Sequence, residues 1–521
     1  MGPLTLITFL PAVGAAVIGL LPAKNHNLIR YTALVTTLIV LIIAGALYPQ
    51  FSRTGFGINE EASFQFVEHA NWIPAFNIEY FVGVDGLSFP MVLLTALLSF
   101  LCIPASFGIK KGVKGYFAMF LLLETGMMGT FVALDFFLFY VFWEIMLLPM
   151  YFLIGIWGGP RRVYAAIKFF IYTLVGSVLM LLVMLAFYFN VQDPVTGANT
   201  FNMLHMMGQD NHSTWLNVFN IRALLWFGLF IGFAIKVPVF PFHTWLPDAH
   251  VEAPTAVSVI LAGILLKMGT YGMLRIMYPI LPDATMSFLW FIALMGVINI
   301  IYGAFCAMAQ KDLKKLVAYS SISHMGYVML GMAAMTSAGI NGAVFQMFNH
   351  GCVTAMLFLL VGVIYERAHH REIARFGNLS NIMPKYLGIS AVAFFGALGL
   401  PGLSAFISEA MVFLGSFPVW PVHTILAVSG IIVTAAYVLW TLQRMFFGEV
   451  KDPALQNLSI EELKKKFPEI NGRELFTLIP LAIIIIFLGI WPHPVLNLMN
   501  ASLVHLIDIV KVAPGSMAGL F

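Results

Sequence analysis

Ionisable side chains occur where the sequence is otherwise strongly apolar, and these are the residues best suited to chemistry. A charge at the centre of a bilayer costs roughly 3 kcal/mol or more, so membrane proteins keep such residues mainly to bind an ion or to move a proton. Eight residues fit this description, the last two lying nearer to helix ends or breaks: Glu124, Glu144, Lys236, Lys267, His350, Glu409, His324 and His243. We expect a proton-translocation path built from them.

Glu144 has no charged neighbour three or four residues away along the chain, so its partner must come from another helix. Lys236 and Lys267 are the natural candidates, because an opposite charge nearby keeps both groups ionised. Moving the carboxylate away from a lysine would switch that lysine from holding a proton to releasing it. A static ion pair that only ties two helices together is the alternative.

Two apolar segments contain helix-breaking residues beside these groups. Pro238 follows Lys236 in the run KVPVFPFHTWLPDAHVEAP, and Pro401 precedes Glu409 in GALGLPGLSAFISEAM. A broken span is tolerated at membrane depth only where the freed backbone faces protein or water. The breaks therefore predict a water-filled cavity beside Lys236, with a simple proline kink as the alternative. Two interrupted helices in corresponding positions also indicate internal repeats.

The histidines and Glu124 allow two interpretations each. Imidazole is well matched to relaying protons near neutral pH, so His324 and His350 could bridge the two breaks. A histidine within a membrane is also a common hydrogen-bonding residue between helices. Glu124, one helix before Glu144, fits a relay and a structural role equally well. No metal site is expected, because the adjacent His369 and His370 lie in a charged loop.

Composition excludes several classes of protein. Of the 521 residues, 60% are hydrophobic and 10% are charged, which excludes a soluble domain. A formal net charge of +3 is too small for a nucleic-acid surface. Three isolated cysteines leave no disulfide framework and no four-thiolate iron–sulfur site, and no glycine-rich nucleotide motif is present. We expect no cofactor in this chain.

Apolar windows of about twenty residues predict the helices that position these side chains. Of the 27 lysines and arginines, 21 fall in odd-numbered connections between windows, which predicts that this side is cytoplasmic and both termini are extracytoplasmic. The first window lacks the features of a cleaved signal and is expected to be retained. There are fourteen windows: 3–21, 29–49, 85–107, 115–134, 136–157, 166–190, 221–246, 253–278, 286–308, 316–336, 340–364, 387–416, 422–446 and 475–498.

The predicted fold is an all-α polytopic membrane protein with about fourteen transmembrane helices. Helices 4–8 and 9–13 would form two inverted five-helix repeats, each with a broken helix. Ser459 and Glu462 have the spacing of a capping box and predict a short surface helix. The expected units are an N-terminal segment with an extracytoplasmic loop, a first repeat, a second repeat, and a cytoplasmic linker with helix 14: 1–110, 111–280, 281–447 and 448–521.

Five runs of the sequence carry a family resemblance. The segments 84–94, 134–159, 236–272, 312–328 and 399–409 resemble subunit M (chain 4) of proton-pumping NADH:quinone oxidoreductase, respiratory complex I. The Lys-x-Pro break with HTWLPDAH is shared by antiporter-like subunits of cation/proton antiporters and membrane hydrogenases, whereas FWEIMLLPMYFLIGIWGG is narrower and favours subunit M. The resemblance extends over essentially the whole chain.

The resemblance also implies roles for residues and partners. Glu144 and Lys236 match the charge pair of the family, and Lys267 matches its central lysine. His324 and His350 match positions on a hydrated axis, and Glu409 matches the acidic residue of the second broken helix. Quinone, FMN and iron–sulfur clusters are expected in partner subunits, with no redox centre in this chain. The expected partners are neighbouring antiporter-like subunits, the peripheral redox arm and the lipid bilayer.

The family's function would make the chain a proton-translocating subunit of an oxidoreductase. The expected location is a prokaryotic plasma membrane, with a thylakoid or organelle membrane as the alternative. Two other functions use the same residues: a sodium/proton secondary transporter subunit, and a passive assembly subunit whose buried charges are structural. Exchange of sodium for protons without an electron donor would favour the first of these. Neutral substitutions that spare turnover would favour the second.

Overall fold

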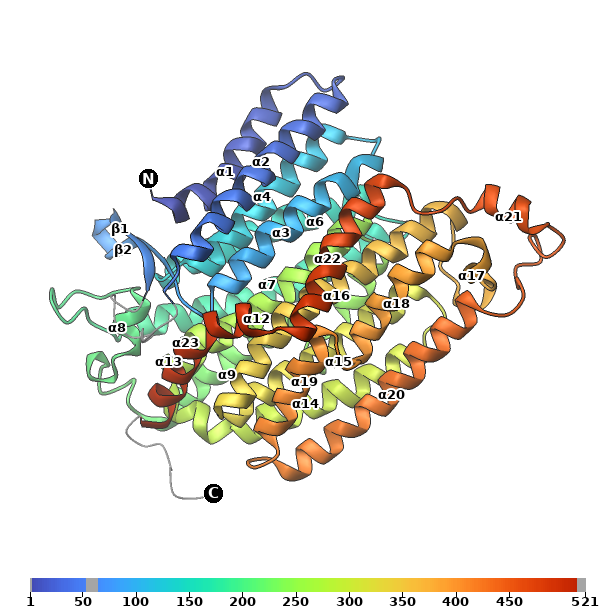
Figure 1. Ribbon diagram of the computed structural model, residues 1–521. Coiled ribbons are helices and arrows are strands. Elements are labelled where there is room, and N and C mark those ends of the chain that lie inside the picture. The colour runs from blue at the N-terminus through green and yellow to red at the C-terminus, as the bar shows by residue number, and fades with distance from the viewer. Residues whose placement is uncertain (1, 53–63, 513–521) are drawn as a thin grey trace.

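The apolar runs fold as long helices in the computed structural model, which describes residues 2–52 and 64–512 (Figure 1). The first half contains α1 (Pro3–Leu20), α2 (His26–Leu47), α3 (Phe89–Ala105), α4 (Val113–Val132), α5 (Phe136–Ile145), α6 (Leu147–Trp157), α7 (Arg162–Tyr188), α8 (Met203–Met207), α9 (Phe219–Lys236), α10 (Trp245–Glu252), α11 (Thr255–Ile260), α12 (Leu266–Gly272) and α13 (Tyr278–Ile280). The second half contains α14 (Pro282–Met308), α15 (Leu313–Ala334), α16 (Ser337–Ala368), α17 (Leu379–Ile382), α18 (Pro384–Leu398), α19 (Ser404–Ser416), α20 (Pro421–Phe446), α21 (Ile460–Lys466), α22 (Gly472–Ile490) and α23 (His493–Val512).

The fold class predicted from the sequence is confirmed. Among the described residues, twelve helical segments are long and apolar enough to cross a membrane. Each of the fourteen predicted windows overlaps a helix. The two windows outside the twelve contain α15 and the shorter pair α18 and α19. The number of fourteen crossings and the inverted repeats remain predictions.

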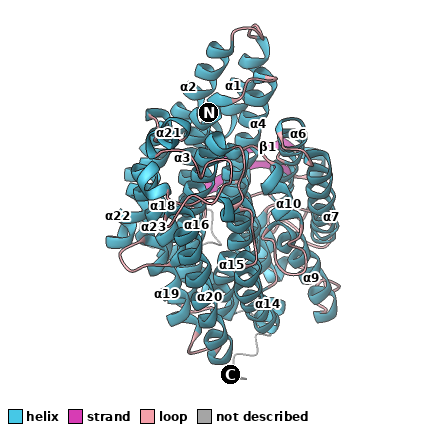
Figure 2. Cartoon of the chain, turned by 90° about the vertical axis from the view of Figure 1, so that its right-hand side faces the viewer, coloured by secondary structure: helices cyan, strands magenta, loops and turns pink. Residues whose placement is uncertain are grey.

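Two helical segments occupy the centre of the bundle. In both α11–α13 and α16, the most apolar stretch is buried completely, whereas in the other candidate spans only part of that stretch is buried. Figure 2 shows α15 and α16 between the outer helices α7 and α22. The π-helical turns Leu261–Leu265 and Met273–Met277 join α11, α12 and α13. These central segments carry Lys267 and His350.

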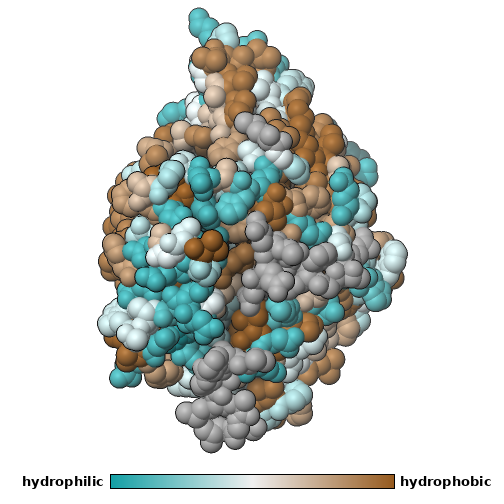
Figure 3. Space-filling view, turned by 90° about the vertical axis from the view of Figure 1, so that its left-hand side faces the viewer, coloured by the Kyte–Doolittle hydropathy of each residue, from teal (hydrophilic) through white to brown (hydrophobic). Residues whose placement is uncertain are grey.

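A β-hairpin that the sequence did not predict lies in the second connection. Strands β1 (Gln65–Ile73) and β2 (Ile78–Val84) pair antiparallel. The Glu68 carboxylate of β1 accepts hydrogen bonds from the backbone N–H groups of Gly2, Leu4 and Thr5 at 2.8, 2.8 and 3.0 Å. It thus satisfies free donors at the start of α1. Figure 3 shows hydrophilic side chains gathered on the face that carries this hairpin.

The C-terminal part differs from the predicted single helix over 475–498. Helix α22 ends at Ile490 and α23 begins at His493, because Pro492 and Pro494 cannot continue the backbone hydrogen bonding of α22. The predicted capping box at Ser459 and Glu462 is confirmed at the start of α21.

Candidate functional site

Lys267 and His350 meet at the centre of the bundle. The Lys267 ammonium nitrogen lies 2.6 Å from Nδ1 of His350 and donates a hydrogen bond of 2.5 Å to the carbonyl oxygen of Ala262. Both side chains are almost inaccessible to solvent. The π-helical turn Leu261–Leu265, which contains Ala262, immediately precedes Lys267, and such turns are frequent at functional sites. The lysine is therefore held between a backbone oxygen and an imidazole.

His324 and Glu409 extend this contact toward the second break. The ring centroids of His350 and His324 are 5.5 Å apart, and Nδ1 of His324 lies 3.3 Å from Oε1 of Glu409. The Nε2 atoms of both histidines lack a hydrogen-bond partner within the described chain. Helices α12, α16, α15 and α19 thus contribute one ionisable side chain each to a continuous row, which we call the central row: Lys267, His350, His324 and Glu409.

The break between α18 and α19 shapes the end of the central row. Gly399 has φ +75°, and a Cβ there would lie 2.7 Å from Oε2 of Glu409, so only glycine leaves room for the carboxylate. Gln346 of α16 donates a hydrogen bond of 3.3 Å to Oε1 of Glu409 and accepts one of 2.5 Å from Ser408. These contacts fix the carboxylate against α16.

Lys236 lies at the first break without a direct anionic partner. Helix α9 ends at this residue, and its ammonium nitrogen is 4.8 Å from the centroid of the Trp143 ring, a cation–π contact. No ion pair within 4.0 Å joins Lys236 to Glu144 in the described residues, and the ammonium has no hydrogen-bond partner there. The predicted contact pair is therefore separated, with an aromatic ring beside the lysine.

Glu144 lies near the outer surface of the chain. Pro149 removes the backbone bond to Ile145 and its ring crowds that carbonyl, which explains why α5 ends at Ile145 and α6 starts at Leu147. Glu144 is half-buried, and its neighbours Ile145 and Leu148 are 39% and 55% exposed. A charge or dipole on an adjoining protein could therefore reach Glu144.

Two other predicted residues stand apart from the central row. Glu124 is completely buried on α4, and neither carboxylate oxygen has a hydrogen-bond partner in the part of the chain described. The ring of His243 lies 5.8 Å from Phe240 and 5.1 Å from Tyr302, centroid to centroid. The structure brings neither residue to Lys267 or Glu409.

Sequence reasoning missed two buried groups between α10 and α15. His250 is fully buried and stacks on Phe358 at 4.5 Å, and both of its ring nitrogens lack partners in the described chain. The Lys314 ammonium donates a hydrogen bond of 2.5 Å to Ala253. The position of His250 in the broken run, four residues before Pro254, was the available signal.

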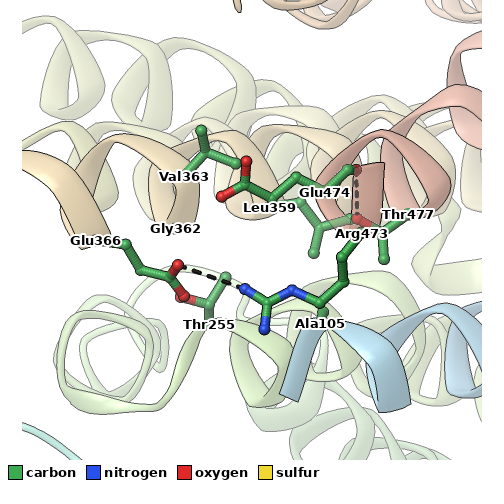
Figure 4. A pocket seen from close by; sticks show the side chains of 9 residues that line it. All are labelled: Ala105, Thr255, Leu359, Gly362, Val363, Glu366, Arg473, Glu474 and Thr477. Atoms are coloured by element: carbon green, nitrogen blue, oxygen red, sulfur yellow. Dashed lines mark hydrogen bonds and ion pairs between the residues drawn. The ribbon is translucent and has the colours of Figure 1, made fainter. Parts of the chain in front are cut away.

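A cavity of about 330 Å³ opens beside Lys314 on the side where the basic connections gather. That volume accommodates several water molecules. A smaller cavity of about 30 Å³ adjoins it, and Figure 4 shows Arg473 reaching toward Glu366 across this cavity, with an ion pair of 3.6 Å. The lining of the larger cavity includes polar and charged residues from several elements: Ser106, Glu252, Lys314, Tyr365, Glu366 and Arg371.

Known proteins resemble this chain in sequence and in fold. Residues 133–434 match the family model "NADH:quinone oxidoreductase/Mrp antiporter, TM", and residues 32–134 match "NADH-ubiquinone oxidoreductase chain 4, amino terminus". The chain is 42% identical to NADH-quinone oxidoreductase subunit M of Rickettsia bellii, over 85% of this chain and 86% of that one. It is 41% identical to subunit M of Rhodobacter capsulatus, over 99% and 98% of the two chains. A chain of respiratory complex I from Thermus thermophilus with bound NADH is similar with a TM-score of 0.79 and 28% identity, covering 96% of this chain and 99% of that one.

Proposed function

The chain belongs to the subunit M (chain 4) family of NADH-quinone oxidoreductase, and from that premise we propose that its central row carries protons across the membrane. It is a membrane subunit of this enzyme. The observation that carries the proposal is the continuity of Lys267, His350, His324 and Glu409. Each side chain lies beside one that can take up its proton. Between the two histidine rings, a bridging water would complete the row.

Protons would enter through the cavity beside Lys314. From there His250, which is fully buried on α10 with both ring nitrogens unpaired in the described residues, would relay protons toward Lys267. A neutral imidazole can accept a proton on one nitrogen and release one from the other. This path would bring protons from the cytoplasmic side to the centre of the central row.

Glu144 and Lys236 would control the direction of transfer. A carboxylate that approaches Lys236 favours its charged form, and one that moves away favours release of the proton. The released proton would pass toward Lys267, and Glu144 is accessible enough to respond to a neighbouring subunit. Each charge moved works against roughly 2.3 kcal/mol per 100 mV of membrane potential. The driving energy must therefore come from the redox reaction.

The same family membership supports proposals about the surroundings of the chain. Its partners are other antiporter-like membrane subunits and, through the complex, a peripheral arm that holds quinone, FMN and iron–sulfur clusters. The plasma membrane of a bacterium is the proposed location, with both termini extracytoplasmic. The predicted repeats, 111–280 and 281–447, place one broken helix each at Lys236 and at Glu409.

Substitution of Glu409 tests the function. Glu409→Gln preserves the shape of the side chain and its capacity to hydrogen-bond but cannot exchange a proton. We expect the assembled complex to lose most NADH-driven proton uptake in proteoliposomes, together with coupled quinone reduction. Glu461→Gln is the control, because this carboxylate is exposed on α21 and lies outside both the central row and the cavity beside Lys314. Wild-type pumping by Glu409→Gln would refute the role of the row.

A further inference from the structure

At the first break, a side chain from another helix forms hydrogen bonds with backbone groups that the break leaves free. Asn299 of α14 is completely buried. Its amide oxygen accepts a hydrogen bond of 2.8 Å from the N–H of Phe240, and its amide nitrogen donates one of 3.3 Å to the carbonyl oxygen of Pro238. Both backbone groups belong to the irregular segment 237–244 that follows Lys236.

We propose that Asn299 is a positioning residue for proton transfer, which fixes the broken segment after Lys236 and thereby the location of its ammonium group. The inference rests on the proposed role of Lys236 as a proton carrier. A buried backbone donor and a buried backbone acceptor both need partners, and a carboxamide supplies both from one planar group. An apolar residue supplies neither of these bonds, and an ionised carboxylate supplies only the acceptor.

The chemistry of Lys236 explains why its surroundings must be fixed. The ammonium has no hydrogen-bond partner in the described residues and lies over the face of Trp143, 4.8 Å from the ring centroid. Its proton affinity therefore depends on distances to Glu144 and to the next proton acceptor, and Coulomb energies change steeply with distance in a low-dielectric site. Backbone bonds from Val237 and Val239 already hold the end of α9, and the Asn299 bonds extend this anchoring to Pro238 and Phe240.

Asn299 also joins the first break to the central row. Ile300, its neighbour on α14, accepts a hydrogen bond of 2.8 Å from the Ser323 hydroxyl, and Ser323 precedes His324 on α15. The two helices pack backbone to backbone, since a Cβ at Gly296 would lie 2.9 Å from the carbonyl oxygen of Gly326. Movement of the segment after Lys236 is therefore resisted by the helix pair that carries His324.

The test uses the intact complex with Asn299→Leu, which preserves approximate volume and removes both hydrogen bonds. Hydrogen exchange of the Phe240 amide should become faster. Coupled turnover should fall by about tenfold to a hundredfold, as for other small misplacements of reacting groups, and its pH profile should shift. Thr285→Val is the matched control: it removes a buried hydrogen bond of 3.0 Å that Trp226 of α9 donates to Thr285 of α14, away from the break. This control should exchange and turn over like the wild type.

Asn299→Asp provides a second test of the positioning role if the complex with Asn299→Leu does not assemble. A protonated carboxyl restores both the donor and the acceptor, whereas an ionised one restores only the acceptor. Turnover of Asn299→Asp should therefore recover as the pH is lowered, relative to the wild type at the same pH. A depressed activity without such recovery would overturn the positioning role.

The outcomes separate this inference from the proposed function. Wild-type turnover and an unshifted pH profile in Asn299→Leu would overturn the inference alone, provided that Lys236→Met abolishes pumping. Wild-type pumping by Lys236→Met would instead overturn the proton-carrying role of Lys236, and with it the basis for a positioning residue at this break.

Discussion

Replacing Lys267 with arginine separates the charge of this side chain from its ability to release a proton. Lys267→Met would leave the Ala262 carbonyl and Nδ1 of His350 without their partner, at a cost of roughly 1–3 kcal/mol for each buried group. Arginine retains a positive charge and several N–H donors for both contacts. It does not give up a proton at neutral pH.

The expected effect of Lys267→Arg is large. The ordinary pKa of a guanidinium lies roughly 2 to 3 units above that of a lysine ammonium, so in the same site arginine holds its proton by roughly 3–5 kcal/mol more. If every transported proton must leave position 267, the path slows by roughly a hundredfold to a few thousandfold. The assembled complex should therefore show almost no protons translocated by this subunit, whereas Lys267→Met should combine a loss of pumping with a loss of stability.

The assay is NADH-driven acidification in proteoliposomes, followed with a pH-sensitive dye beside the rate of NADH oxidation. Native gel electrophoresis establishes that the variant complex has assembled. A Lys267→Arg complex that translocates the wild-type number of protons per NADH would refute the reasoning, because Lys267 could then contribute only its charge.

Three further outcomes are expected. Glu144→Gln should sharply reduce pumping and coupled turnover in an assembled complex, and unchanged pumping would remove Glu144 from the mechanism. Arg275→Met should lower the melting temperature of the complex, because it leaves Asp85, which is 1% exposed, without its ion-pair partner. The expected loss in the free energy of unfolding is about 3–5 kcal/mol. The double variant Arg275→Met with Asp85→Leu should recover part of this loss. Burial lowers the pKa of His212 to about 4 from its usual value near 6.5, so the folded loop around His212 binds fewer protons than the unfolded one. The free energy of unfolding of this loop should be greatest above about pH 6.5 and should fall by at most about 3 kcal/mol as the pH decreases toward 4. The fall would be measured as faster hydrogen exchange over 190–215. Exchange that is independent of pH after correction for its intrinsic rate would contradict this.

Sequence reasoning could identify the reacting residues because a charge within an apolar run is visible along the chain. Lys267 and Glu409 needed no tertiary information to be recognised. Their contacts did, since Lys267 meets His350 across 83 residues and Glu409 meets His324 from a different helix. The separation of Glu144 from Lys236 likewise depends on where Trp143 packs, which no spacing rule predicts.

The structural features that could not be predicted from the sequence belong to short helices, short strands and breaks between helices. His250 lies on α10, an eight-residue helix between prolines that reads as a loop. The hairpin of β1 and β2 sits in a polar connection without the alternation of a half-buried strand, because four consecutive residues, 69–72, are exposed. In the last window, apolar stretches lie on both sides of Pro492. Their hydropathy, averaged over the window, predicts a single hydrophobic helix, although the helical backbone is interrupted between them.

Irregular backbone and ionisable side chains coincide at three places. Lys236 ends α9 at a break, Lys267 follows a π-helical turn, and Glu409 follows the break at Gly399. In a regular helix the backbone N–H and C=O groups bond to one another, so none remains to hydrogen-bond a buried charge. An interrupted helix leaves carbonyl groups available, such as that of Ala262, which accepts a hydrogen bond from Lys267. At Lys267 the interruption therefore reduces the cost of keeping an ionisable group at membrane depth. Glu409 instead takes its partners from α15 and α16, and Lys236 has no hydrogen-bond partner in the described residues.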